Sequence, residues 1–274
     1  MIAAALQYCA SSDIVKNCDM ASKLIDSAAD KAAQLVALPE CANLLAASKT
    51  QLFQKAESQQ NSLFLQMLQA KAKEKQIWIS AGSLLLQCED EDDQRIANRQ
   101  LIISPQGEIT ASYDKIHMFD ADVGDGKDYR ESASFRPGTQ PVMTRINDRL
   151  AGLSICYDIR FAQLYHHYAA NKAELLFIPA AFTAVTGKAH WHVLQRCRAI
   201  ETGAFVIAAA QIGTHDDGRQ TYGHALIIDP WGRVLSDAGR TEDMAIASLD
   251  FDKVIEARRS LQAWKTQQAI NELS

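Results

Sequence analysis

The stretch Phe205-Val206-Ile207-Ala208-Ala209-Ala210 is an uninterrupted apolar run. Such a run is typical of a β-strand covered on both faces, because a strand with one solvated face alternates apolar and polar residues. Residues 2–9 and 34–40 are similar short runs, and they flank residues 13–33, where apolar side chains recur at helical spacing. The chain therefore opens as strand, helix, strand, which predicts an α/β fold.

Strands and helices continue to alternate along the chain. Strands are expected at residues 77–86, 98–104, 109–114, 142–146, 151–156, 175–181, 205–213, 225–229, 233–236 and 245–251, and helices at about 58–74, 161–171 and 190–202. Hairpins mixed with strand-helix-strand units imply mixed sheets. The simplest arrangement is two such sheets packed together with helices outside, a four-layer α-β-β-α sandwich, although periodicity alone fits an open three-layer sheet equally well.

The chain is long and apolar enough to bury a sizeable core, with 274 residues of which 47% are hydrophobic. It contains no internal repeat, low-complexity tract or linker rich in Pro, Gly and Ser where a domain boundary could fall. We therefore expect one domain over residues 1–274, with residues 252–274 forming a C-terminal helix or tail.

Charge and composition narrow the range of partners. The 28 basic and 33 acidic residues are scattered, and the net charge of -5 argues against binding to nucleic acid. Residues 1–10 are apolar, but this stretch is short and lacks a basic flank, so neither a signal peptide nor a membrane segment is expected. These features predict a cytoplasmic protein.

The cysteines and histidines do not form a recognisable ligand or disulfide pattern. The six cysteines lack paired spacing, so we expect reduced thiols. His166 with His167, His190 with His192, and His215 with the two acids after it lack a complementary ligand set, so no metal is expected. Because the chain also lacks Gly-x-Gly-x-x-Gly and Gly-Lys-Ser/Thr motifs, no nucleotide cofactor is expected.

Three reactive side chains stand where predicted strands end. Glu40 ends the run 34–40, Lys115 follows the strand 109–114, and Cys156 lies between a strand and a helix. Taken singly, each fits a bland interpretation: a loop glutamate, a surface lysine and a buried structural thiol. In a parallel-type sheet, however, the ends of such strands meet at one crevice.

These three groups would form a coherent chemical set in one pocket. The acid can accept the thiol proton, the sulfur can attack a carbonyl carbon, and the ammonium can stabilise the negative charge that develops on oxygen. A histidine base is therefore not required. His117, two residues after Lys115, fits a satisfied loop histidine as well as a chemical role.

With these motifs the chain resembles the nitrilase superfamily of carbon-nitrogen hydrolases over about residues 1–259. The resemblance is carried, in this order, by Leu38-Pro39-Glu40, Tyr113-x-Lys115-x-His117, Glu131-Ser132 with Pro137-Gly138, and Cys156-Tyr157-Asp158-x-Arg160-Phe161. It implies that Glu40 is the general base, Lys115 supports the tetrahedral intermediate and Cys156 is the nucleophile. It also implies that Glu131 orients Lys115 or the substrate, and that the backbone N–H of Tyr157 completes the oxyanion site.

The resemblance implies amide hydrolysis through a thioester acyl-enzyme, with release of ammonia and without a metal or organic cofactor. Within the superfamily, residues 186–191, 208–215, 222–224 and 229–232 resemble the branch that contains deaminated glutathione amidase and omega-amidase. Residues 208–215 with 222–224 favour the former, and alpha-ketoglutaramate, the omega-amidase substrate, is the second choice. Candidate substrate-binding residues are Thr186, His190 and Trp191 together with Tyr157, although the first three fit a structural role at the loop and helix start equally well.

Other interpretations stay open at this point. A different amidase or carbamoylase of the superfamily and a catalytically inactive scaffold both fit the fold-level resemblance. A homodimer is also implied by the resemblance, although the polar tail after Arg259 lacks the proline-containing ending common in such relatives.

Overall fold

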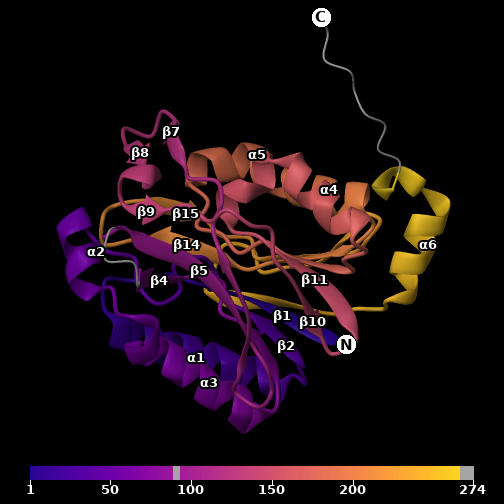
Figure 1. The fold of residues 1–274 in the computed structure, drawn as a ribbon, viewed down its shortest axis with the longest axis horizontal. Helices are drawn as coiled ribbons and strands as arrows, with labels where there is room; N and C mark the ends of the chain where they lie inside the picture. The colour runs from indigo at the N-terminus through magenta and orange to yellow at the C-terminus, as the bar shows by residue number, and fades with distance from the viewer. Residues whose placement is uncertain (89–92, 266–274) are drawn as a thin grey trace, which may run out of the picture.

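A computed structural model describes residues 1–88 and 93–265. Two mixed β-sheets lie back to back, and helices cover the outer face of each sheet (Figure 1). The helices α1 (Ile14–Asp30) and α3 (Leu63–Lys75) cover one side, whereas α4 (Ala162–Ala170) and α5 (Ala184–Thr202) cover the other. This arrangement confirms the predicted four-layer α-β-β-α sandwich and excludes the open three-layer sheet.

The larger sheet is built around β1 (Ile2–Tyr8), which pairs in parallel with β2 and β14 and antiparallel with β18. Its other strands are β2 (Leu35–Ala37), β3 (Trp78–Ser80), β4 (Leu84–Gln87), β5 (Ile96–Ile103), β6 (Ile109–Asp114), β9 (Phe135–Arg136), β14 (Ala210–Thr214), β15 (Gln220–Tyr222) and β18 (Asp243–Ser248).

The smaller sheet has the strand order β10-β11-β12-β13-β16-β17. Its strands are β10 (Met143–Ile146), β11 (Arg149–Leu153), β12 (Leu175–Phe177), β13 (Phe205–Ala208), β16 (Leu226–Ile228) and β17 (Val234–Asp237). The remaining elements are the hairpin β7 (Asp120–Asp122) and β8 (Asp128–Arg130), the helices α2 (Lys49–Lys55) and α6 (Asp252–Ser260), and the 3-10 turns η1 (Gln59–Asn61), η2 (Glu131–Ala133), η3 (Cys156–Arg160) and η4 (Gln262–Trp264).

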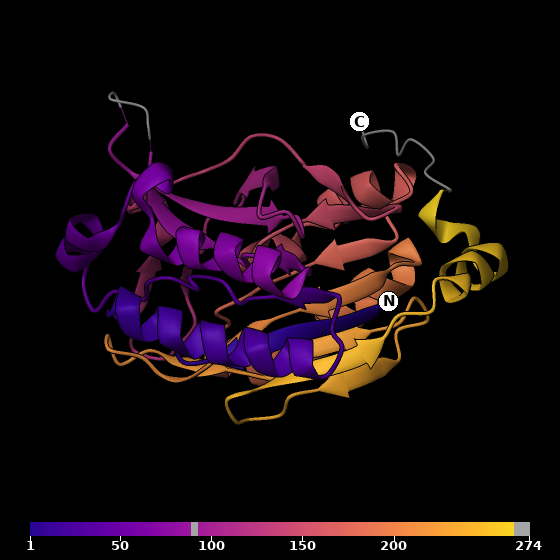
Figure 2. The same ribbon diagram turned by 90° about the horizontal axis from the view of Figure 1, so that it is seen from below.

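Burial on both faces explains why the strands read as continuous apolar runs. In β1, Ala3 and Ala5 pack into the core between the sheets, whereas Ala4 and Leu6 face the core under α1 and α3. Figure 2 shows α1 and α3 lying across the outer face of the larger sheet. Because both faces are dry, no polar residue is required at alternate positions.

Two predicted strands are each divided in the structure. Residues 205–213 form β13 in the smaller sheet and β14 in the larger sheet, so the chain changes layer near Ala209. Residues 77–86 form β3 and β4, separated by a turn at Gly82 with φ of +63°. A side chain there would lie 2.0 Å from the Leu38 carbonyl oxygen. Apolar continuity does not show such breaks, because the residues on both sides of each break are buried.

The helix boundaries also differ from the pattern-based expectation. The helix α5 begins at Ala184, six residues before the predicted start, because the Thr183 side chain accepts a hydrogen bond from the Thr186 N–H and caps it. At the C-terminus, α6 ends at Ser260, and residues 266–274 of the predicted tail lie outside the described residues. Among the described residues, no helix combines the length and apolar character needed to cross a bilayer.

Candidate active site

Three strand ends from two sheets supply the central groups of the site. Glu40 follows β2 and Lys115 follows β6 in the larger sheet, whereas Cys156 follows β11 in the smaller sheet. The strand ends converge as expected, but they belong to two sheets, because the crevice forms where the ends of the two stacked sheets meet. The structure nevertheless brings all three side chains to one cavity.

Lys115 lies between two carboxylates. Its Nζ is 2.9 Å from Glu40 Oε1 and 2.8 Å from each carboxylate oxygen of Glu131. Lys115 is 1% exposed and Glu40 is 4% exposed, so water screens this group weakly. The two carboxylates place the ammonium in the cavity wall and fix its direction.

Asn98 on β5 links the same two carboxylates. Its Nδ2 donates to Glu40 Oε1 at 3.0 Å and lies 3.4 Å from Glu131 Oε1. The backbone completes the arrangement, because the Ala181 N–H donates to Glu40 Oε2 at 2.8 Å and the Phe119 N–H donates to Glu131 Oε2 at 2.6 Å. Sequence reasoning missed Asn98, and the available signal was its place, with Arg99 and Gln100, in the polar part of a strand that is apolar from Leu101 onward.

The charges of the cluster support one another. Burial, the largest influence, raises the pKa of Glu40, but the charge of Lys115 and hydrogen bonds from Lys115, Cys156 and the Ala181 N–H lower it below its ordinary value of 4.5. Burial lowers the pKa of Lys115, but the charges of Glu131 and Glu40 outweigh this effect and raise it well above 10.5. Glu40 is therefore anionic and Lys115 cationic at neutral pH.

Cys156 stands at the start of the 3-10 turn η3 with φ of +50°, an unusual conformation for a residue with a side chain. Burial and the charge of Glu40 raise the pKa of its thiol well above 9.0, although Lys115 and the Ala181 N–H oppose them. The resting site therefore holds a thiol beside an anionic glutamate. The strand-to-helix junction therefore does not by itself favour a thiolate.

The motif residues Tyr113, His117 and Asp158 lock this turn onto the larger sheet. Asp158 accepts hydrogen bonds from Tyr113 Oη at 2.7 Å and from the His117 N–H at 3.0 Å, and it lies 2.7 Å from His117 Nδ1. Asp158 also accepts the Ile155 N–H at 2.8 Å. His117 stacks on Phe161 with the ring centres 3.5 Å apart, so it is a satisfied structural histidine.

A cavity of about 350 Å³ opens beside Cys156, Glu40, Lys115 and Glu131. Basic and acidic side chains line its outer part: Lys49, Lys127, Asp128, Arg130, Asp217 and Arg219. We call these residues the charged rim. Arg219 and Asp217 pair at 2.9 Å, and Arg130 and Asp128 pair at 2.6 Å. With four cations and two anions, the charged rim has an excess of positive charge.

The predicted substrate-binding residues divide into two groups. Tyr157 and Thr186 line a second, smaller cavity that also contacts Cys156. His190 and Trp191 line neither cavity: Trp191 is 1% exposed and donates its indole N–H to the His224 carbonyl, whereas His190 Nδ1 lies 3.2 Å from an Arg160 nitrogen. The helical turn of α5 directs Trp191 into the core. Trp191 therefore has the structural role that the sequence left open as an alternative to substrate binding.

Comparison with known proteins supplies the family. The carbon-nitrogen hydrolase model matches residues 2–259. A deaminated glutathione amidase from Synechocystis sp. is 40% identical over 262 residues, which cover 95% of each chain. The crystal structure of the Caenorhabditis elegans NitFhit protein superposes with a TM-score of 0.90 at 33% identity, covering 97% of this chain and 65% of that chain.

A second solved structure agrees with this result. Saccharomyces cerevisiae Nit3, described as a member of branch 10 of the nitrilase superfamily, superposes with a TM-score of 0.85 at 27% identity and covers 95% of this chain and 94% of that one. The family match spans both sheets and every residue of the Glu40, Lys115, Glu131 and Cys156 cluster. The chain therefore belongs to the carbon-nitrogen hydrolase family of the nitrilase superfamily and is a hydrolase of non-peptide carbon-nitrogen bonds.

Proposed function

We propose that this enzyme cleaves a small amide that carries carboxylate groups, with deaminated glutathione as the first candidate and alpha-ketoglutaramate as the second. The observation that carries the proposal is the contact of Lys115 with Glu40 and Glu131 in the cavity that contains Cys156. Such an arrangement supplies a nucleophile, a base and a fixed cation in a poorly solvated site.

Glu40 acts as the general base in the first step. The Cys156 sulfur attacks the amide carbonyl carbon while Glu40 takes the thiol proton, which suits an anionic glutamate beside a protonated thiol. Negative charge develops on the carbonyl oxygen, where the Lys115 ammonium and the backbone N–H of Tyr157 stabilise it. Glu40 then returns the proton to the leaving nitrogen, and a thioester to Cys156 remains.

Water completes the reaction in the second step. Glu40 accepts a proton from water as the oxygen attacks the thioester carbonyl, and the Cys156 sulfur leaves and recovers its proton. Glu131 keeps Lys115 directed toward the oxyanion throughout, because both of its oxygens bind the ammonium. The chain's own residues supply every proton transfer, so the proposed reaction needs no cofactor.

The charged rim supports a substrate with carboxylate groups. Lys49 donates to the Ala133 carbonyl, and Lys127 donates to the Asp217 backbone carbonyl at 2.5 Å while its Nζ lies 3.9 Å from the carboxylate Oδ1 of Asp217. Neither lysine is therefore held by a close carboxylate. A cavity of about 350 Å³ is at the small end of the usual range for ligand sites. The Synechocystis relative is named a deaminated glutathione amidase, which supports that substrate as the first candidate.

The two candidate substrates differ in their leaving group. The release of ammonia that the family resemblance implies applies to only one of them. The scissile amide nitrogen of deaminated glutathione belongs to cysteinylglycine, so its cleavage releases that dipeptide. Cleavage of alpha-ketoglutaramate releases ammonia instead. Assays of purified enzyme on each amide should therefore measure the dipeptide and ammonia separately, with a Cys156→Ala variant as the blank. If neither product exceeds the blank, the substrate assignment is wrong.

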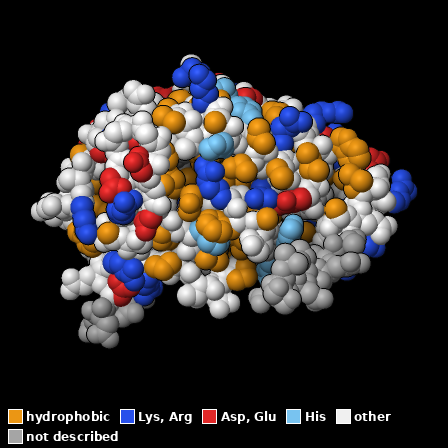
Figure 3. All heavy atoms as spheres, turned by 90° about the horizontal axis from the view of Figure 1, so that it is seen from above, with side chains coloured by type: hydrophobic (Ala, Val, Ile, Leu, Met, Phe, Trp, Pro, Cys, Tyr) orange, Lys and Arg blue, Asp and Glu red, His pale blue; other side chains and the backbone are white. Residues whose placement is uncertain are grey.

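We propose a homodimer as the assembly. The side chains of Val193 and Ile200 on α5 are 68% and 46% exposed, and their spacing of seven residues places them on one helix face. Trp231 and Ile255 are also exposed, and Figure 3 shows apolar side chains across the surface on the α4 and α5 side. Light scattering should give a dimer mass for the native enzyme and a monomer mass for a Val193→Asp variant. A monomeric native enzyme would contradict the proposal.

We also propose a cytoplasmic location, since the six cysteines form no disulfide within the described structure. Fractionation of the source cells with an antibody to the enzyme tests this location. Recovery of the protein outside the cytoplasm would contradict it.

A further inference from the structure

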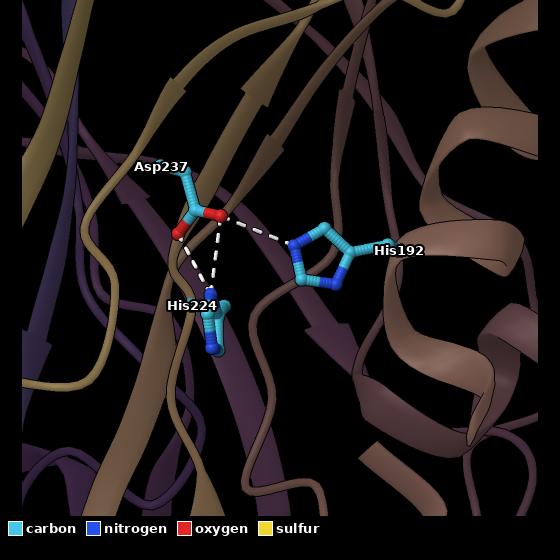
Figure 4. Close-up of side chains that lie close together, drawn as sticks. All are labelled: His192, His224 and Asp237. Carbon is cyan, nitrogen blue, oxygen red and sulfur yellow. Dashed lines mark hydrogen bonds and ion pairs between the residues drawn. The ribbon is translucent and has the colours of Figure 1, made fainter. Parts of the chain in front are cut away.

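Two histidines and an aspartate meet on the surface away from the Cys156 cavity. His192 lies on α5, His224 lies two residues before the start of β16, and Asp237 is the last residue of β17. Figure 4 shows the Asp237 carboxylate between the two imidazole rings, each of which points one nitrogen toward it. One ligand atom from each residue lies within 4.8 Å of the other two.

We propose that His192, His224 and Asp237 bind a divalent zinc ion. Two neutral imidazoles and one carboxylate are a donor set that zinc uses, with water completing the coordination. His192 and its neighbour His190 alone do not form a ligand pattern, so no metal is expected from the sequence. The ligands that complete the set lie 32 and 45 residues further along the chain, and only the fold brings them together.

The distances suit a tetrahedral ion. His192 Nε2 lies 3.1 Å from Asp237 Oδ2, and His224 Nδ1 lies 3.0 and 3.1 Å from the two Asp237 oxygens. Zinc-ligand bonds of about 2.0 to 2.1 Å place neighbouring donor atoms about 3.3 Å apart. Binding therefore requires each nitrogen to separate from Asp237 by a few tenths of an ångström, with its proton moving to the other ring nitrogen through solvent. The two nitrogens, which lie within 4.8 Å of each other, must also come to the tetrahedral spacing.

Neighbouring groups hold the ligands in place. The backbone of His224 has φ of +55°, its N–H donates to the Gly239 carbonyl at 2.8 Å, and its carbonyl accepts the Trp191 indole N–H at 2.7 Å. The Tyr222 ring stacks on His224 with the ring centres 4.6 Å apart. Asp237 accepts the Gly239 N–H at 2.7 Å. A site whose ligands are oriented by such outer contacts loses less entropy on binding an ion.

The two histidine ligands are also accessible from solvent. The side chains of His192 and His224 are 34% and 19% exposed, so an ion can reach them from solvent.

Calorimetric titration with zinc chloride tests the proposal on the full chain. The titration uses the Cys156→Ala background, because Cys156 and Glu40 are a second group that could bind zinc. We expect one zinc per chain in this background and a loss of affinity of about tenfold or more when His192→Ala or Asp237→Asn is added. Asp237→Asn retains an oxygen that can accept the Gly239 N–H, so it changes the charge with little effect on the fold.

The control variant is His167→Ala, which removes an exposed histidine on α4 outside the cluster and should leave the affinity unchanged. Cobalt substitution gives an independent readout, with a spectrum free of thiolate charge transfer. The proposal is overturned if the Cys156→Ala protein binds no zinc, as expected of a cluster held by hydrogen bonds alone. It is equally overturned if the two ligand variants bind zinc as tightly as their background.

Discussion

The Lys115 ammonium and the Glu40 carboxylate form an ion pair of 2.9 Å in the interior, where neither side chain is more than 5% exposed. Each group is placed at the end of a different strand of the larger sheet. Because burial alone would favour the neutral form of both groups, the pair persists as ions through their mutual attraction and through Glu131. The ion pair therefore keeps Glu40 ionised as a base and Lys115 ionised as an oxyanion donor.

Replacing Lys115 by Ala should reduce kcat by a factor of about 10² or more, because one fixed oxyanion donor is lost. The change also leaves the carboxylates of Glu40 and Glu131 close together without the cation that both contact. Steady-state kinetics on the better of the two amides measures the effect. Lys127→Ala, a change of a lysine in the charged rim, is the matched control and should mainly raise KM. Equal loss of kcat in both variants would contradict the role of Lys115.

Removing the Asn98 side chain should lower kcat by about tenfold or more, since a hydrogen bond to a charged group contributes about 1.5 to 3 kcal/mol. Asn98→Ala removes the amide group that bridges Glu40 and Glu131, whereas the contacts of both carboxylates with Lys115 persist. Gln100→Ala is the control, because Gln100 is buried two residues further along β5 and bonds to Ser80 instead. Both variants should lose stability in thermal unfolding, and only Asn98→Ala should lose kcat beyond the fraction that is unfolded.

The pH profile of kcat/KM should be flat across the neutral range. Productive attack requires anionic Glu40 and protonated Cys156 in the free enzyme, and the pKa of the first lies below 4.5 while that of the second lies well above 9.0. Activity should therefore fall only as acid protonates Glu40 below pH 4.5, or as base ionises Cys156 above pH 9.0. Circular dichroism at each pH separates titration from unfolding. A limb near pH 7 would contradict this assignment.

Alkylation should select Cys156 only when the reagent resembles an amide. The pKa values of all six thiols are raised, so ionisation of the resting protein does not single out Cys156. Iodoacetamide should label Cys156 faster than the exposed Cys197, because its amide can occupy the site beside Lys115. Peptide mass spectrometry measures both rates. Glu40→Gln should remove the preference, and uniform labelling of the folded native protein would argue against an activated nucleophile.

The sequence by itself determined the α/β class and the positions of Glu40, Lys115 and Cys156 at the ends of apolar runs, and it left the four-layer sandwich and an open three-layer sheet as alternatives. These features are local, because a run of buried residues and the polar residue that ends it are adjacent in the chain. Motif order added the expected role of Glu131. Local patterns therefore indicate which residues are candidates for catalysis.

Only the tertiary structure decided which partners those residues meet. Contacts between distant segments decide that Asn98 binds two carboxylates and that His117 binds Asp158. They also decide that the chain passes from one sheet to the other near Ala209. The cluster of His192, His224 and Asp237 depends on them too. Periodicity indicates whether a side chain is buried, because burial depends on which face of its own helix or strand the side chain lies on. It does not indicate which residues that side chain contacts, because those contacts depend on how whole sheets and helices pack together.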